Sequence, residues 1–155
     1  MSLAVRAPLA GRVVMLDDVP DPVFSSRIVG PGLAIDPDRG HGTATATAPI
    51  SGILSKVHPH AYVTVSPEGR SVLVHLGPVA APAVFPSAAP ATPPSAVTAE
   101  IAAGEPIITW SPATIEAGGH NPIVPVIALG AAAESLTSAP AGETLTRGAV
   151  AFTWG

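Results

Sequence analysis

Proline and glycine interrupt this 155-residue chain so often that long helices are excluded. The sequence holds 19 prolines and 15 glycines, and a proline inside a helix removes a hydrogen bond and clashes with the preceding turn. The intervening runs are rich in Val, Ile, Leu and Ala, and aromatic residues make up only 4% of the chain. Short β-prone runs bounded by turn residues predict an all-β fold, an antiparallel sandwich or barrel formed by a single domain over residues 1–155.

The composition also excludes several functions. Seven Lys and Arg against eleven Asp and Glu give a net charge of −4, so the chain lacks the basic surface that nucleic acid requires. Because there is no cysteine, there is no disulfide, thiolate metal site or Cys nucleophile. The longest stretch without Asp, Glu, Lys or Arg, residues 71–99, contains six prolines, and the N-terminus lacks the apolar run of a signal peptide. We therefore expect a cytoplasmic protein without membrane insertion.

A short motif occurs twice. Ala-Pro-Leu-Ala-Gly followed by Arg-Val-Val at residues 7–14 returns as Ala-Pro-Ile-Ser-Gly followed by Ile-Leu at residues 48–54. In each copy Pro and Gly mark a turn that leads into a β-prone run. Chance similarity in a chain rich in Ala, Pro and Gly is the alternative. We interpret the pair as an internally duplicated β motif.

Further strands are expected at residues 33–35, 60–65, 71–76, 107–110, 123–129 and 149–154. A few short helical turns are expected where a capping residue precedes a proline, at residues 21–24 and 111–114. The segment 78–99 differs from the rest, because Ala, Pro, Val, Ser and Thr dominate it and charge and glycine are absent. Its composition is typical of a semi-rigid linker or loop.

One turn predicts which residues of two strands face each other. Residues 66–69, Ser-Pro-Glu-Gly, lie between the strand candidates 60–65 and 71–76 and have the preferences of a type I turn. If this turn closes a hairpin, His60 lies directly opposite His75, with Cβ atoms about 5 Å apart. Two facing imidazoles form a plausible nucleophile and partner, because a neutral imidazole nitrogen is available near pH 7.

The same register pairs Val65 with Arg70 and sorts the hairpin into two faces. The predicted core face holds Ala61, Val63, Val72 and Val74. The predicted outer face holds His60, Tyr62, Thr64, Ser71, Leu73 and His75.

Two other interpretations of these histidines stay open. The first is that the two histidines form a cross-strand pair on the surface that has no function. A zinc site is the second alternative, since His58 and His60 have the H-x-H spacing, but no carboxylate at metal spacing supplies a third ligand. His41 and His120 lie in glycine-rich segments and are expected to be solvated.

The residues around the two histidines resemble the glucose-type enzyme IIA family of the bacterial phosphoenolpyruvate-dependent sugar phosphotransferase system. The most specific motifs are D-V-P-D-x-V-F, H-A-[FY] and V-H-[FL]-G, in that order. Similarity covers roughly two thirds of the chain. The resembling segments are residues 7–14, 17–37, 48–65, 69–77 and 105–129.

The resemblance implies a phosphohistidine carrier with no cofactor and no metal. His75, in V-H-L-G, would accept a phosphoryl group from the phosphocarrier HPr and pass it to the IIB domain of a sugar permease. His60, in H-A-Y, would lie beside it and help to hold that group. Asp21, Val23 and Phe24 would lie on the rim that docks partners, which include regulatory protein targets. Apolar neighbours such as Val74, Leu76 and Phe24 are expected to exclude water.

The chain departs from the family after Gly77. Where the family continues with Asp-Thr, this sequence has Val79 and Ala80 and then the segment rich in Ala and Pro. One strand and part of the site rim are therefore in question, and a change of reading frame in the gene is one explanation.

Two alternatives to the carrier follow. The first is a degenerate or regulatory homologue that binds partners without transfer. The second, a zinc peptidase of the lysostaphin type, is disfavoured because no histidine is followed by Asp four residues later.

Overall fold

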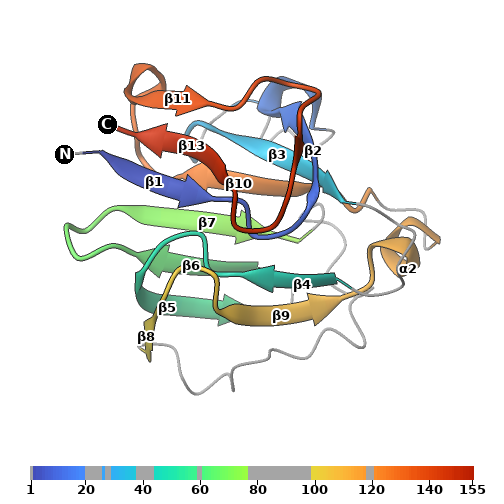
Figure 1. Cartoon of the computed structure of the whole chain (residues 1–155), viewed down its shortest axis with the longest axis horizontal. Coiled ribbons are helices and arrows are strands. Elements are labelled where there is room, and N and C mark those ends of the chain that lie inside the picture. Colours follow the sequence, from blue (N-terminus) through green and yellow to red (C-terminus); the bar gives the residue numbers. More distant parts are fainter. Residues whose placement is uncertain are drawn as a thin grey trace.

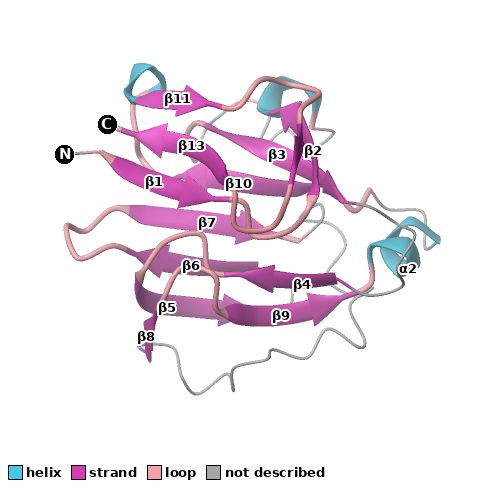
Figure 2. Ribbon diagram, in the orientation of Figure 1, coloured by secondary structure: helices cyan, strands magenta, loops and turns pink. Residues whose placement is uncertain are grey.

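The all-β prediction is confirmed by a computed structural model, which describes residues 2–19, 26, 29–37, 44–58, 61–76, 99–117 and 121–155. Strands make up most of this part of the chain, and its helices are short (Figures 1 and 2). The strands are β1 (Leu3–Arg6), β2 (Gly11–Met15), β3 (Gly32–Pro37), β4 (Ala44–Thr47), β5 (Gly52–His58), β6 (Ala61–Val65), β7 (Ser71–His75), β8 (Ala99–Ile101), β9 (Pro106–Trp110), β10 (Val124–Ala128), β11 (Leu136–Ser138), β12 (Thr144–Leu145) and β13 (Val150–Trp154). The helical elements are η1 (Leu16–Asp18), α2 (Pro112–Ala117) and η3 (Ala133–Ser135).

Three antiparallel sheets build the part of the molecule that the structure describes. The largest has eight strands in the order β12-β2-β3-β10-β7-β6-β5-β8. A three-stranded sheet, β1-β13-β11, and a two-stranded sheet, β4-β9, complete the fold. β1 and β13 lie beside the upper strands of the large sheet in Figure 1, and β4 and β9 beside the lower ones. No helix in the described part is long and apolar enough to cross a membrane.

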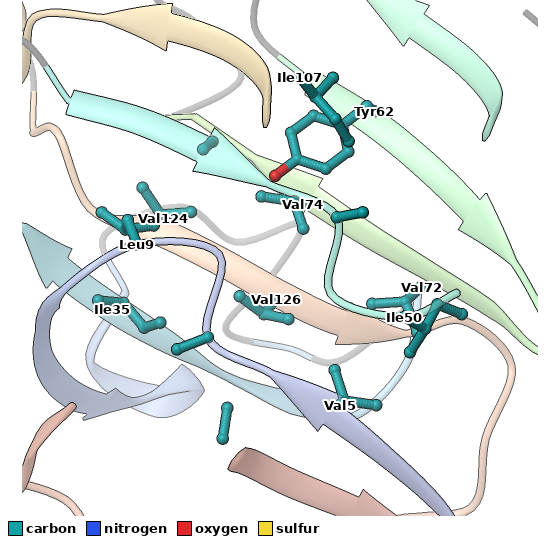
Figure 3. Packing of buried hydrophobic residues seen from close by; sticks show 14 of the residues in the cluster. Val5, Leu9, Ile35, Ile50, Tyr62, Val72, Val74, Ile107, Val124 and Val126 are labelled. Carbon is teal, nitrogen blue, oxygen red and sulfur yellow. The ribbon is translucent and has the colours of Figure 1, made fainter. Parts of the chain in front are cut away.

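The main core lies on one face of the large sheet. Side chains from that face meet side chains from the two smaller sheets, and Figure 3 shows how branched aliphatic residues fill the space between them. Side chains alternate between the two faces of a strand, so every second residue points to the same side and can enter this core. Buried members from the large sheet include Val13, Leu33, Ile35, Leu54, Tyr62, Val72, Val74, Val124 and Val126; the small sheets contribute Val5, Ala46, Ile107, Ile108, Trp110, Phe152 and Trp154.

The duplicated motif predicted from the sequence is a structural duplication. Arg6 donates its backbone N–H to the carbonyl of Pro49 at 2.9 Å, and Thr47 donates its N–H to the carbonyl of Pro8 at 2.9 Å. Each copy of the motif therefore accepts a hydrogen bond from the residue that immediately precedes the other copy. Such reciprocal hydrogen bonds are the expected signature of two copies related by a two-fold rotation.

The duplication continues in segments where the sequence repeat is faint. Residues 99–110 and 143–154 share the pattern of a glycine followed five and six residues later by Thr-Trp. β9 pairs with β4 as β13 pairs with β1, with a register shift at the same place in each pair. β8 joins β5 as β12 joins β2. The large sheet therefore has two equivalent halves that meet between β10 and β7.

Candidate functional site

β7 is one of the two central strands of the large sheet, and His75 is its last residue. β7 runs toward the side of the molecule on which α2 lies (Figure 1). Val72 and Val74 are fully buried in the main core. Leu73 and His75 alternate with them and therefore lie on the opposite face of the sheet. His75 is only 6% exposed, so its imidazole lies among protein atoms more than in solvent.

The hairpin that leads to His75 has the predicted turn. The N–H of Gly69 donates to the carbonyl of Ser66 at 2.9 Å, which is the hydrogen bond of a four-residue turn. Gly69 has a φ of +90°, a left-handed conformation that glycine adopts without a Cβ clash.

The predicted register of this hairpin is wrong by one residue. Ser66 pairs with Arg70, because the N–H of Ser66 donates to the carbonyl of Arg70 at 2.8 Å. The left-handed Gly69 adds one residue to the β7 side of the loop, as in a three-residue hairpin with a glycine bulge. Val65 therefore pairs with Ser71, and the residue opposite His75 is Ala61. The prediction that His60 lies directly opposite His75 is therefore wrong.

The face assignment of β6 changes with the register. Tyr62 and Thr64 are fully buried and pair with Val74 and Val72. The predicted core residues Ala61 and Val63 belong instead to the face that carries Leu73 and His75. A shift of one residue exchanges the two faces of a strand, so the error in the turn accounts for the whole exchange.

A second apolar cluster lies on part of the face of the sheet that carries His75. Its buried members come from η1, from β3, from β10 and from the residues next to these elements: Leu16, Val19, Ala34, Ile123 and Ile127. Leu73 packs against this cluster and pairs with Ile127 in the ladder. The water-excluding neighbours expected at Val74 and Leu76 are therefore misassigned, because both side chains are buried in the main core.

The sequence did not predict that Ala61 is the residue opposite His75. Directly opposed residues of an antiparallel pair have Cβ atoms about 5 Å apart, so Ala61 is the nearest cross-strand neighbour of His75 on β6. Ala61 is 6% exposed. On the other side of β6, the ladder pairs Ala61 with His58 of β5. The available signal was the small residue in a strand otherwise made of Tyr, Val and Thr.

The core beneath this pair is fixed by Tyr62. Its phenol donates a 2.7 Å hydrogen bond to the carbonyl of Thr47. Desolvation by burial raises the pKa of Tyr62 well above its ordinary value, so the phenol stays neutral and keeps this donor.

An open cleft of about 460 Å³ lies at the turn end of the same hairpin, away from His75. It is lined by Ser51, Gly52, Pro67, Glu100, Ile101, Ala102 and Glu105. None of these residues is a histidine. His75 is not among the residues that line this cleft.

The other predicted site residues, His60, Asp21, Val23 and Phe24, lie outside the described residues. The helical turn expected at 21–24 and residues 78–98 of the atypical segment also lie outside them. The turn expected at residues 111–114 is the start of α2. Among the described residues no cluster of three or more His, Asp or Glu side chains could hold a metal ion.

Comparisons with known proteins identify the class to which this fold belongs. A family model for the phosphoenolpyruvate-dependent sugar phosphotransferase system, EIIA 1, matches residues 3–133. The match covers most of the chain and includes both copies of the duplicated motif, β6 and β7. The chain belongs to this EIIA family.

Particular relatives narrow the resemblance to glucose-type members. The chain is similar to the glucose-specific EIIA component of the phosphotransferase system from Halalkalibacterium halodurans, with 41% identity over 75 residues, 47% of this chain. It is also similar to that of Buchnera aphidicola, with 38% identity over 75 residues. These matches span 41% and 44% of the two relatives, so the chain covers less than half of each curated relative.

A solved structure is similar over the whole chain. Glucose permease IIA from Mycoplasma capricolum superposes with a TM-score of 0.79 and 26% sequence identity. The superposition covers 99% of this chain and 96% of the other. The β-sandwich architecture is therefore shared with a glucose-type IIA structure from end to end.

Proposed function

We propose that this protein is a phosphohistidine carrier of a sugar phosphotransferase system. His75 accepts a phosphoryl group from phospho-HPr and passes it to the IIB domain of a sugar permease. The observation that carries the proposal is the position of His75 within the EIIA match: a nearly buried imidazole at the end of β7, on the face of the sheet that carries the second apolar cluster.

The chemistry needs little from the protein beyond placement. A lone pair of a neutral His75 nitrogen attacks phosphorus, and an N–P bond to His75 forms as the N–P bond to the donor imidazole breaks. Each imidazole keeps the proton on its other nitrogen, so no proton is transferred overall. Phosphoryl transfer depends on in-line positioning and on stabilisation of charge.

The apolar surroundings support a carrier over a hydrolase. The buried cluster around Ile127, with Leu73 packed against it, makes part of this face of the sheet apolar, and exclusion of water suppresses hydrolysis of a reactive intermediate. The phosphoryl group is then lost to another protein and not to solvent.

The partner contacts in the proposal follow the family resemblance. His60 helps to hold the phosphoryl group, and Asp21, Val23 and Phe24 lie on the rim where HPr, the IIB domain and regulatory proteins dock. The absence of cysteine assigns the IIB step to a separate chain or domain.

The test is intact-mass spectrometry after incubation with phosphoenolpyruvate, enzyme I and HPr. The wild-type protein is expected to gain one phosphoryl group, and His75→Ala is expected to gain none while keeping its fold. His120→Ala is the matched control and is expected to gain one group. Labelling of His75→Ala would show that the acceptor is another residue. A folded wild-type protein that gains nothing would favour the regulatory, non-transferring homologue.

A further inference from the structure

The pair formed by Ala61 and His75 differs from the other pairs of its ladder. On the same face, the next pair is Val63 with Leu73, two branched aliphatic side chains. At the end of the ladder the branched residue is replaced by the smallest side chain that has a Cβ. Alanine is depleted in strands, where β-branched and aromatic residues are favoured, so the local preference of β6 does not account for Ala61.

The volume beside the His75 imidazole is set by protein side chains. Ala61 and His75 are each only 6% exposed, so a group added to the ring cannot simply extend into solvent. A phosphoryl group adds a phosphorus and three oxygens to a ring nitrogen. Side chains of directly opposed residues stand next to each other on one face of the sheet, so γ-carbons at position 61 would occupy space beside the imidazole.

We propose that Ala61 is a positioning residue for the reaction of His75: its small side chain leaves the space in which the phosphoryl group is held. The inference rests on the proposed carrier function and adds a size requirement at the site. A larger residue at position 61 closes that space, and a smaller one admits water to it.

The half of the large sheet formed by β12, β2, β3 and β10 has a related arrangement without the imidazole. Its ladder pairs Gly32 with Ile127 at the position where the other half pairs Ala61 with His75. At position 32 there is no room for a Cβ, because it would run into the carbonyl oxygen of Val126. Backbone crowding accounts for the small residue in that half, whereas the methyl group of Ala61 is accommodated in the other.

The experiment compares two phosphoryl donors of different size on a graded series at position 61. The donors are phospho-HPr and phosphoramidate, whose P–N bond breaks with release of ammonia as the N–P bond to His75 forms. The series is Ala61→Gly, Ala61→Ser, Ala61→Val and Ala61→Leu. Val63→Leu, on the same strand and face, is the matched control. Labelling that persists in a His75→Ala background is subtracted.

We expect Ala61→Leu to accept phosphoryl about 100-fold more slowly and Ala61→Val about tenfold more slowly, from both donors. Ala61→Ser and Val63→Leu should stay within about threefold of the wild type. Ala61→Gly should accept normally but lose its phosphoryl group to water faster than the wild type. Tryptophan fluorescence in urea identifies any variant that does not fold, and Ala61→Val and Ala61→Gly remain informative if Ala61→Leu is such a variant.

The two proposals fail in different ways. Wild-type rates for folded Ala61→Leu or Ala61→Val with phosphoramidate overturn the size requirement and leave the carrier function intact. Slow labelling of these variants by phospho-HPr alone also overturns it, because the substitution would then act on docking. A wild-type protein that phosphoramidate labels at His75 and phospho-HPr does not label overturns the carrier function.

Discussion

Tyr62 donates a 2.7 Å hydrogen bond to the backbone carbonyl of Thr47 inside the main core. Tyr62 is the only tyrosine of the chain, so its ionisation can be followed without interference. Burial raises its pKa in the folded state, whereas in the unfolded chain it titrates near pH 10, as model peptides do. Above about pH 10 the unfolded state therefore holds fewer protons than the native state, and stability falls as pH rises.

This linkage predicts that Tyr62 does not ionise while the protein is folded. The ultraviolet absorbance of tyrosinate should stay absent while the protein is folded, and it should appear together with the loss of native tryptophan fluorescence. The same titration in concentrated urea, where Tyr62 is exposed, should give a midpoint near pH 10. A tyrosinate signal that develops in the native protein at that pH would contradict the buried hydrogen bond.

Replacing the phenol tests the same contact at neutral pH. Tyr62→Phe keeps the ring and removes the donor, which leaves the carbonyl of Thr47 buried without this partner. The expected loss is about 1–2 kcal/mol in the free energy of unfolding, measured by urea denaturation at pH 7. The variant should also lose the alkaline decline described for the wild type. Unchanged stability at pH 7 would show that the hydrogen bond makes no net contribution.

Arg70 connects the β6–β7 turn to the last strand. Its Nη1 donates to the carbonyl of Trp154 at 2.6 Å, and its guanidinium carbon lies 5.3 Å from the centroid of the indole ring. Arg70→Ala should lower the free energy of unfolding by about 1–2 kcal/mol and shift the tryptophan emission. Arg70→Lys keeps the charge but not the planar fork, and it should restore only part of the loss. Full restoration by lysine would assign the effect to charge alone.

Two glycines with unusual φ angles should differ in their tolerance of a side chain. Gly52 has a φ of +156°, and a Cβ there would run into the carbonyl oxygen of Val65. Gly69 has a φ of +90° with open space around it. Gly69→Ala should cost about 1 kcal/mol of backbone strain, and Gly52→Ala should cost about 3 kcal/mol or more, because the backbone must also move. Equal losses in urea denaturation would contradict the crowding at Gly52.

Within the proposed function, His60→Gln separates acceptance from delivery. The variant should still gain one phosphoryl group from phospho-HPr, since His75 is intact. Transfer to a IIB domain should slow about 10- to 100-fold, because glutamine holds the phosphoryl group less well in line for the next acceptor. His41→Ala serves as the control for a histidine that the proposal gives no role. Onward transfer at the wild-type rate would remove His60 from the mechanism.

Local signals in the sequence predicted the elements that carry His75. Pro67 and Gly69 defined the turn at residues 66–69, and the period-two pattern defined the strands on either side of it. The two Ala-Pro motifs indicated the duplication, because their turns recur with the same residue types. The bounds of the six additional strands that the sequence predicted lie within two residues of the bounds of β3, β6, β7, β9, β10 and β13.

What the sequence did not predict depends on contacts between distant segments. β1 and β4 are short strands of ordinary composition, and they are fixed by β13 and β9, far along the chain. β8 and β12 have three and two residues, too few for a periodic pattern. The register error had another cause, because the turn preferences of Ser, Pro and Gly do not say whether the glycine is counted inside the strand pairing. That single residue decided which side chain faces His75.

The pairing of β1 with β13, at opposite ends of the duplicated fold, has a consequence for synthesis of the chain on the ribosome. β1 is made first but hydrogen-bonds to β13, which ends at Trp154, and the reciprocal bonds through Pro8 and Pro49 join the two copies. The nascent chain must therefore hold its first strand unpaired until residue 154 has left the exit tunnel. Closure of long loops is slow and leaves strand edges exposed in the meantime. We expect the last step of folding to be the entry of β13 between β1 and β11, after all the strands that precede β13 have been synthesised.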